Sequence, residues 1–309
     1  TEPILGYNAD GSPKINPNAP LYSEKGFSTK PEYRATDYYL MDGYNDSNYP
    51  DVTPERDGKR LIVQPNTFNM YCHREPRFYL TVVWNGQWFK WENRNTNFLY
   101  GQPDGGPTHD APQNGYLNRS RVSLDYNNHP YRPAIIFRMA EAYLSYAEAL
   151  NESSERMSHK QEILDNLNKI RHRAGIAEYG TGTDENGFTR IKINFSDQKE
   201  VRRLIHKERR VEFVGEGVRY HDLRRWKTAH YGIGNLNEQG ENPDWGVNGP
   251  DYGMNYYGTE YTDQGDNAFF KRTKYMDRVY PRKFYWYPIH QSEIDKDPTL
   301  VQGPFWLGE

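Results

Sequence analysis

The chain has 309 residues, of which 35% are hydrophobic, enough to bury the core of one large or two modest domains. Its 39 Lys and Arg residues against 42 Asp and Glu leave a formal net charge of −3, so nucleic acid is not expected as a partner. No apolar run approaches the roughly 20 residues that a membrane-spanning helix needs, so the sequence predicts no such helix.

Residues 1–131 are predicted to hold loops and one small β-hairpin. The chain opens with TEPILGYNAD, without Met or an apolar leader, so we expect translation to start upstream. A hairpin is predicted over residues 78–93, because alternating residues flank Asn85-Gly86, a dipeptide favoured in tight hairpin turns. One face of this hairpin would carry Phe78, Leu80, Val82 and Trp84. Residues 92–130 show no regular periodicity, which predicts a long loop.

Residues 132–228 are predicted to form the helical core. Apolar residues recur every three or four positions from Arg132 onward, which predicts an amphipathic helix. Its buried stripe would be Ile136, Met139, Tyr143, Ala147 and Leu150. A second helix is predicted from a capping box of Ser158 and Gln161 to Gly175, with a stripe of Ile163, Leu167, Ile170 and Ala174.

A third helix is predicted to begin at Ser196 as its N-cap and to end near Gly215 and Gly217. Its buried side would carry Val201, Leu204, Ile205, Val211 and Val214. A short helix over residues 218–228 follows. Residues 229–309 are predicted to be a long loop and a C-terminal segment, since residues 229–282 show no clear element and so long a loop usually has a function.

The aromatic content is the unusual feature of the composition. Aromatic residues make up 15% of the chain, with 26 Tyr and 7 Trp, although the mean hydropathy is −1.04. Tyr and Trp combine an apolar face with a polar tip, which suits half-exposed surfaces that stack against ligands. The alternative is that the Tyr-rich loops only pack on the helical body.

The sequence also contains residues that could form three other kinds of site. Glu208 and Glu212 lie one helical turn apart and could act as the paired acids of a glycosidase, but surrounding arginines favour structural ion pairs. Cys72-His73 offers too few ligands for zinc. The acidic and amide residues between Asp42 and Asp51 could offer oxygens to calcium but lack EF-hand spacing, so we expect no cofactor.

The segment KERRVEFVGEGVRYHDLRRWKTA at 207–229 resembles the signature helix pair of the SusD/RagB family of outer-membrane nutrient-binding lipoproteins. Three other stretches agree in order: REPRFYLTVVWNG, FRMAEAYLSYAEALNE with LNKIRHRAGI, and YPIHQSEIDKDPTLVQGPFW. The sequence departs from the family pattern at Gly215, Val218, His221 and His290. The family's N-terminal part, with its lipid-bearing Cys, is not in this stretch.

The resemblance implies a mainly α fold, in which a SusD-like helical body of tetratricopeptide-like helix pairs carries long irregular loops and a small β-hairpin. The chain would be the C-terminal part of a single SusD-like domain. The family likeness further implies a non-catalytic protein, lipid-anchored on the cell-surface face of the outer membrane in a Bacteroidetes-type bacterium. Its partner would be a SusC-like TonB-dependent barrel transporter. The signature residues Asp222, Arg224, Arg225 and Trp226 are expected to hold helices together.

The hypothesis that follows is capture of oligosaccharides by aromatic side chains of the two long loops, without catalysis. The candidate ligand-binding residues are Trp88, Trp91, Tyr100, Trp245, Tyr252, Tyr256 and Tyr257. One alternative is capture of oligopeptides by a RagB-like protein, which would rely on backbone hydrogen bonds. A remote alternative is a glycoside hydrolase that uses Glu208 and Glu212.

Overall fold

The computed structural model describes residues 71, 76–89, 92, 94–118, 135–185, 187–232, 246–262 and 265–306. Before residue 64, the structure describes only the backbone of five short strands. They are β1 (Ile4–Tyr7), β2 (Pro13–Ile15), β3 (Tyr39–Leu40), β4 (Glu55–Arg56) and β5 (Lys59–Val63). β1 pairs with β2, and β5 lies between β3 and β4, all antiparallel.

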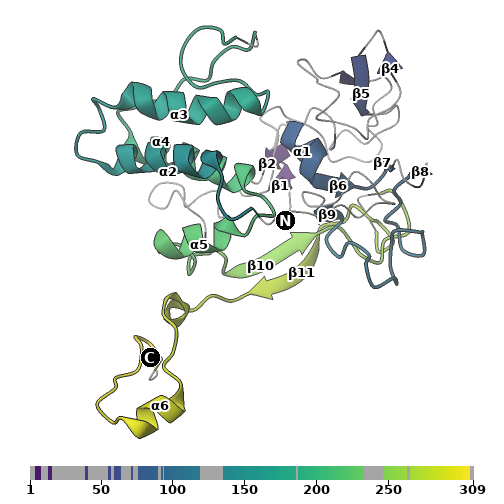
Figure 1. Cartoon of the computed structure of the whole chain (residues 1–309). Helices are drawn as coiled ribbons and strands as arrows, with labels where there is room; N and C mark the ends of the chain where they lie inside the picture. The colour runs from purple at the N-terminus through teal and green to yellow at the C-terminus, as the bar shows by residue number, and fades with distance from the viewer. Residues whose placement is uncertain are drawn as a thin grey trace.

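The helical body consists of α2 (Met139–Glu152), α3 (Lys160–Arg173), α4 (Gln198–Glu212) and the short α5 (Val218–Arg225) (Figure 1). α2 packs against both α3 and α4. Their shared core is Ala140, Leu144, Ala147, Leu150, Ile163, Leu167, Ile170, Val201, Ile205 and Phe213. None of the helices that the structure describes combines the length and the apolar character needed to cross a bilayer. The predicted mainly α fold is therefore confirmed.

The first predicted helix is wrong in its start and in part of its buried stripe. α2 begins at Met139, because the preceding Arg138 has an extended backbone and its guanidinium donates to the carbonyl of Glu212 and the carboxylate of Glu216. Ile136 is 95% exposed and Met139 is 58% exposed. The side that faces the core instead carries Ala140, Leu144, Ala147 and Leu150.

The two predicted helix caps are each wrong by one residue. His159, not Ser158, is the N-cap of α3, and the Ser158 hydroxyl donates to the carbonyl of Glu155. Asp197, not Ser196, caps α4, because its carboxylate accepts the backbone N–H groups of the residues two and three positions ahead. The stripe predicted for α3 is buried as expected.

The predicted hairpin over residues 78–93 is wrong in its pairing. Residues Pro76–Thr81 form a short helix, α1, and the following β6 (Val82–Trp84) pairs with β9 (Tyr116–Asn118). β7 (Trp88–Phe89) pairs with β8 (Arg94–Asn95). Asn85 is buried, and its side chain accepts the N–H of Phe98 at 2.7 Å. The turn at Asn85-Gly86 therefore places Asn85 against the backbone of Phe98 and does not connect two paired strands.

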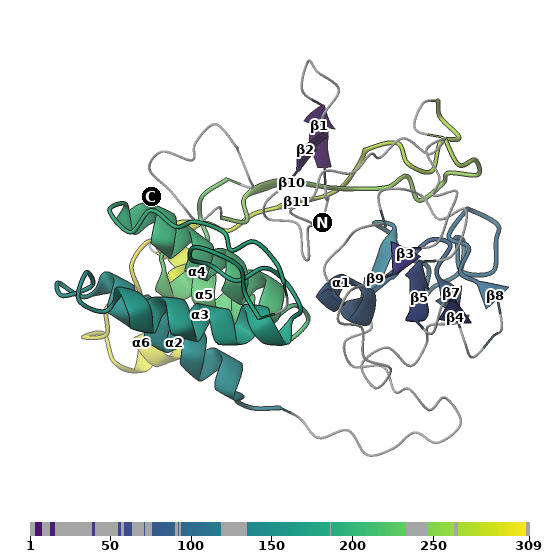
Figure 2. The ribbon, with the colours of Figure 1, turned by 90° about the horizontal axis from the view of Figure 1, so that it is seen from above.

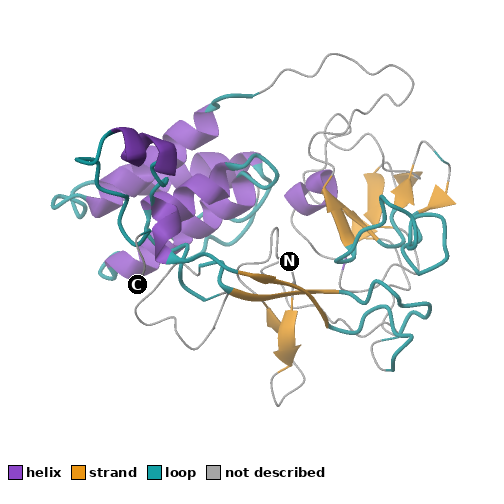
Figure 3. Ribbon diagram, turned by 90° about the horizontal axis from the view of Figure 1, so that it is seen from below, coloured by secondary structure: helices purple, strands orange, loops and turns teal. Residues whose placement is uncertain are grey.

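A long two-stranded ribbon lies inside the segment predicted as a loop. β10 (Gly249–Gly253) pairs antiparallel with β11 (Thr273–Arg278), and Figures 2 and 3 show it running between the helical body and the part built from α1 and β6–β9. Its sequence lacks clear alternation, since nearly all of β11 is exposed. A 3-10 helix, η4 (Arg282–Tyr285), and a short helix, α6 (Gln291–Lys296), complete the chain.

Candidate functional site

Two loops far apart in the sequence meet at three tyrosines, Tyr100, Tyr256 and Tyr257, which we call the tyrosine cluster. The backbone N–H of Tyr100 donates to the carbonyl of Gly258 at 2.8 Å. The ring centroid of Tyr100 lies 6.1 Å from that of Tyr256 and 5.6 Å from that of Tyr257, and the last two lie 5.1 Å apart. In Figures 1 and 2 the loop that follows β8 and the loop that follows β10 lie side by side.

The tyrosine cluster presents an aromatic surface to solvent. Tyr257 is 69% exposed, whereas Tyr100 and Tyr256 are half-buried. The rings of Tyr256 and Tyr257 stand perpendicular, with an interplanar angle of 90°. An exposed ring supported by two neighbours can receive the apolar face of a ligand while the phenol hydroxyls bond its polar groups.

The position of Tyr256 depends on a glycine in the opposite loop. A Cβ atom at Gly106 would lie 2.5 Å from Cζ of Tyr256, so only glycine leaves room for the ring where it is. The carbonyl of Gly106 also accepts the N–H of Gly101 at 2.6 Å. These contacts shape the loop so that the two tyrosine-bearing segments pack closely.

An ion pair stabilises the loop that carries Tyr100. The carboxylate of Asp104 accepts two hydrogen bonds from the guanidinium of Arg94, at 2.6 and 2.8 Å, and one from the N–H of Asn97 at 2.7 Å. Burial acts to raise the pKa of Asp104, but these hydrogen bonds outweigh it and hold the pKa below its ordinary value. The carboxylate of Asp104 is therefore ionised at neutral pH, and it links this end of the loop to Arg94 and Asn97.

Two amide side chains fix the second loop and join it to the first. Asn255 is buried; its side chain donates to the carbonyls of Asp266 and Ala268 and accepts the N–H of Tyr257 at 3.1 Å. The hydroxyl of Tyr261 donates to the Asn97 side chain at 2.9 Å. Sequence reasoning missed these positioning residues, although Asn in a Tyr-rich loop is a signal for such side chain–backbone bonds.

Among the other candidate ligand-binding residues, Tyr252 has a described side chain, and it lies outside this cluster. Tyr252 lies in β10, where the guanidinium of Arg272 covers its ring at 3.5 Å. Trp88 lies in β7, of which the backbone is described. Trp91 and Trp245 lie outside the described residues.

Neither metal candidate from the sequence can be placed, since the calcium segment Asp42 to Asp51 and Cys72-His73 also lie outside the described residues. Within the described ranges, no group of three or more His, Cys, Asp or Glu residues could hold a metal ion.

The acid pair considered for glycoside hydrolysis lies inside a group of arginines. Glu208 accepts from Arg77 at 2.7 Å and from Arg171 at 3.1 Å. Burial acts to raise the pKa of Glu208, but the positive charges of Arg77 and Arg171 lower it below its ordinary value. The general acid of a glycosidase needs a raised pKa, so Glu208 is unsuited to that role.

Glu212, the second acid of the pair, is buried among three guanidinium groups. Its carboxylate contacts Arg77 at 3.0 Å and also binds Arg138 and Arg173. Burial acts to raise the pKa of Glu212, but the hydrogen bonds from Arg173 and Arg138 and the charge of Arg77 lower it. The predicted structural role of this pair is therefore confirmed.

The signature residues hold the helices together, as expected. Asp222 of α5 accepts two hydrogen bonds at 2.9 Å from Arg209 of α4. Glu148 of α2 binds the guanidinium of Arg225 and accepts Trp226 Nε1–H at 2.7 Å. Arg224 donates to the carbonyl of Tyr285 at 3.0 Å, which joins α5 to η4.

The buried carboxylates predict a loss of stability in acid. The pKa of Glu148 is lowered because hydrogen bonds from His206, Arg225 and Trp226 outweigh the effect of burial, as the arginines do for Glu208 and Glu212. A group whose pKa is lower in the folded state contributes stability above its unfolded pKa of about 4.3. We expect the free energy of unfolding in urea to fall as the pH drops below about 4. A value unchanged between pH 7 and 3 would contradict this expectation.

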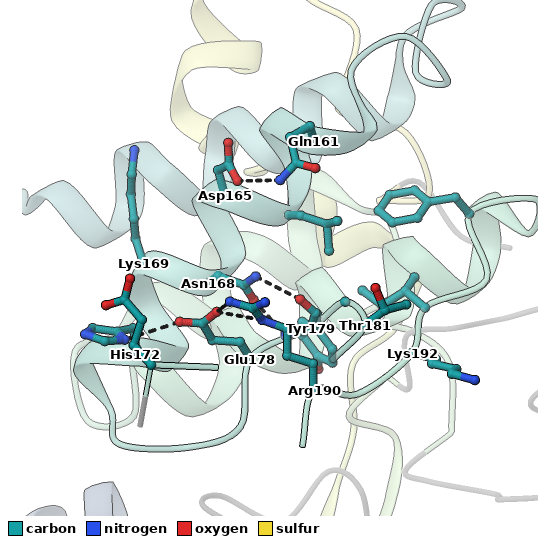
Figure 4. Close-up of a pocket in the computed structure, with 15 residues that line it drawn as sticks. Gln161, Asp165, Asn168, Lys169, His172, Glu178, Tyr179, Thr181, Arg190 and Lys192 are labelled. Carbon is teal, nitrogen blue, oxygen red and sulfur yellow. Dashed lines mark hydrogen bonds and ion pairs between the residues drawn. The ribbon is translucent and has the colours of Figure 1, made fainter. Parts of the chain in front are cut away.

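A concave surface with a volume of about 900 Å³ lies elsewhere, between α3 and residues 178–195 (Figure 4). Several of its polar groups bond one another: Arg190 donates to Glu178 at 2.8 Å, and Asn168 donates to the carbonyl of Tyr179 at 2.9 Å. Figure 4 shows Lys169 on the far side of this bonded group from Thr181. These polar groups are therefore already bonded within the chain, whereas the tyrosine cluster exposes an aromatic ring to solvent.

Comparison with known proteins points to one family. The sequence profile of the SusD family matches residues 5–306. The SusD-like proteins P38 and P25 of Formosa agariphila are each 32% identical, over 103 and 108 residues, which is 33% and 34% of this chain. These matches span only 19% and 18% of the two relatives.

Two solved structures share the fold. BT4246 has a TM-score of 0.57 and 21% identity, with coverage of 97% of this chain and 44% of that protein. A SusD-like protein from Bacteroides fragilis has a TM-score of 0.56 and 22% identity, with coverage of 98% and 50%. The chain thus spans about half the length of these solved relatives.

Proposed function

Because the chain belongs to the SusD family, we propose that it captures oligosaccharides at the cell surface and delivers them, unaltered, to an outer-membrane transporter. The observation that carries the proposal is the tyrosine cluster, in which Tyr257 is 69% exposed and supported by two further rings. The CH faces of a sugar ring are apolar and its hydroxyls are polar, which matches the two sides of a tyrosine.

Capture without catalysis is supported by the state of the acid pair. Glu208 and Glu212 are both buried and bound by arginines, and the pKa of each is lowered. Neither can serve as a proton donor near neutral pH. We therefore propose that this chain binds its ligand without altering it.

The proposed function is tested by a binding screen of the protein against parallel panels of neutral oligosaccharides and oligopeptides, measured by calorimetry. We expect saturable binding of at least one oligosaccharide and no release of reducing ends. Binding of peptides alone would replace this proposal with peptide capture by a RagB-like protein. Release of reducing sugar that is lost in Glu208→Gln would replace it with hydrolysis.

We also propose a lipid-anchored position on the outer membrane and a SusC-like TonB-dependent barrel as the transporter. Family membership supports both parts of this proposal. The test is affinity purification of the tagged protein from its own membranes in mild detergent. Recovery of such a barrel supports the proposal, whereas a monomer that carries no barrel would count against it.

A further inference from the structure

The two loops that form the tyrosine cluster carry more acidic than basic residues. They are residues 96–115, between β8 and β9, and residues 254–272, between β10 and β11. Together they contain five Asp and Glu residues but only two Lys and Arg, whereas the whole chain has 42 acidic and 39 basic residues. In 0.15 M salt, exposed charges act over about 8 Å, so this local excess, more than the net charge of the chain, determines the potential at the cluster.

Both cations of the second loop are already engaged within the chain. The ammonium group of Lys271 binds the carboxylate of Asp266 at 2.8 Å. The guanidinium carbon of Arg272 lies 3.5 Å from the ring centroid of Tyr252, which is outside the tyrosine cluster. A cation that is bound in this way offers little charge to an incoming anion.

Arg94, which lies in β8 just before the first loop, is shared between two carboxylates. Its guanidinium donates to Asp104 at 2.6 and 2.8 Å and to Glu92 at 2.7 Å. One positive charge thus faces two negative charges, which leaves a net negative charge at this end of the loop. Arg94 is therefore poorly suited to bind the carboxylate or sulfate of a ligand.

Glu260 places a negative charge near the exposed ring of the cluster. It follows Tyr257 by three residues, so their Cα atoms are at most about 11 Å apart. The side chain of Glu260 is exposed, and it forms no ion pair with another residue in the part of the chain that the structure describes. The N–H of Glu260 donates to the carbonyl of Asn267 at 3.0 Å, and its carbonyl accepts the N–H of Phe269 at 2.9 Å. The backbone that carries this charge is therefore held in place.

We propose that these charges restrict the tyrosine cluster to uncharged oligosaccharides, with Glu260 as the residue that repels carboxylate and sulfate groups. This inference rests on the proposed function, because it names the class of sugar that the same surface takes. A sugar that stacks on Tyr257 brings its ring substituents close to Glu260. An anionic substituent there meets a like charge, which disfavours the wrong ligand without adding affinity for the right one.

A matched pair of ligands tests the selectivity by calorimetry. The neutral oligosaccharide that binds most tightly in the screen is compared with the same oligosaccharide after oxidation of its C6 hydroxymethyl groups to carboxylates. We expect the oxidised form to bind about tenfold more weakly or worse at low salt, and the difference to narrow as salt is added. Equal or tighter binding of the oxidised form would overturn the proposal.

The role of Glu260 is tested with the variant Glu260→Gln. The ratio of the two affinities should move towards one in this variant, because the repelling charge is removed. The matched control is Glu293→Gln, which removes an exposed carboxylate on α6 and should keep the original ratio. A ratio that Glu260→Gln leaves unchanged would overturn the proposal.

A further measurement determines the charge around the cluster without any sugar, which separates a wrong selectivity from a wrong function. A fluorinated tyrosine replaces Tyr257 or, in a second sample, Tyr287, whose ring centroid lies 5.1 Å from the guanidinium carbon of Arg224. The relaxation of the fluorine NMR signal by a cationic nitroxide is compared with that by an anionic one. We expect the cationic nitroxide to act more strongly at Tyr257 and the anionic one at Tyr287.

An equal or stronger effect of the anionic nitroxide at Tyr257 would overturn the proposed selectivity, even in a protein that binds sugars. A negative charge at Tyr257 in a protein that binds no oligosaccharide would instead overturn the proposed function, and this inference with it.

Discussion

Replacing Tyr257 with Ala is expected to weaken oligosaccharide binding about tenfold to a hundredfold, because a large apolar side chain that leaves water contributes roughly 1.5–3 kcal/mol. Tyr257 is the most exposed member of the tyrosine cluster, so its ring is the one free to meet a ligand. Calorimetric titration with the tightest-binding oligosaccharide of the screen measures the change. Stability should hardly change, since the ring is 69% exposed.

The control for Tyr257→Ala is Tyr287→Ala, which removes a tyrosine that is 79% exposed in the C-terminal segment. We expect the control to bind like the original protein. A second variant, Tyr257→Trp, keeps a stacking ring and should keep most of the affinity. If Tyr257→Ala binds as tightly as the original protein, the tyrosine cluster is not the capture site.

The helices of the core could be predicted from the sequence because their apolar residues repeat with the period of a helix. Periodicity alone could not decide which side of α2 faces the core, since Met139 and Ala140 start two competing apolar stripes. Packing against α3 and α4 selects the stripe of the smaller Ala140 and Ala147 with Leu144. The larger Ile136 and Met139 are left exposed.

The β structure was harder to predict because long-range contacts overrule the local signal. Asn85-Gly86 does form a turn, in which Gly86 has a φ of 87°. The buried Asn85 side chain, however, binds the backbone of Phe98, and the strands on either side pair elsewhere. A rule based on neighbouring residues does not include such partners.

The tyrosine cluster was only partly predictable. Composition indicated that aromatic rings of two long loops could form a ligand surface, and the structure brings Tyr100, Tyr256 and Tyr257 together. The meeting of the loops depends on single atoms, such as the missing Cβ of Gly106 and the side-chain oxygen of Asn97, which accepts from Tyr261. These contacts join segments about half the chain apart, which no local pattern encodes.

Replacing Glu212 with Gln is expected to lower the free energy of unfolding by about 3–5 kcal/mol, the usual cost of removing one partner from a buried ion group. Gln keeps the shape of the side chain but leaves the charges of Arg77, Arg138 and Arg173 without the carboxylate that they share. Urea unfolding at pH 7 measures the loss.

The matched control is Glu152→Gln, which removes a carboxylate of similar shape that is paired with Arg202 at the surface. An exposed ion pair contributes about 0–1 kcal/mol, so this variant should unfold almost like the original protein. The effect of Glu212→Gln should also shrink as the pH falls below about 4, because acid neutralises the same carboxylate in the unfolded chain and then in the folded one. Equal stability of Glu212→Gln and the original protein at pH 7 would show that the arginines are satisfied by other groups. The expected pattern would show that the ion pairs of Glu212 with Arg77 and Arg138 hold α4 to α1 and to the start of α2.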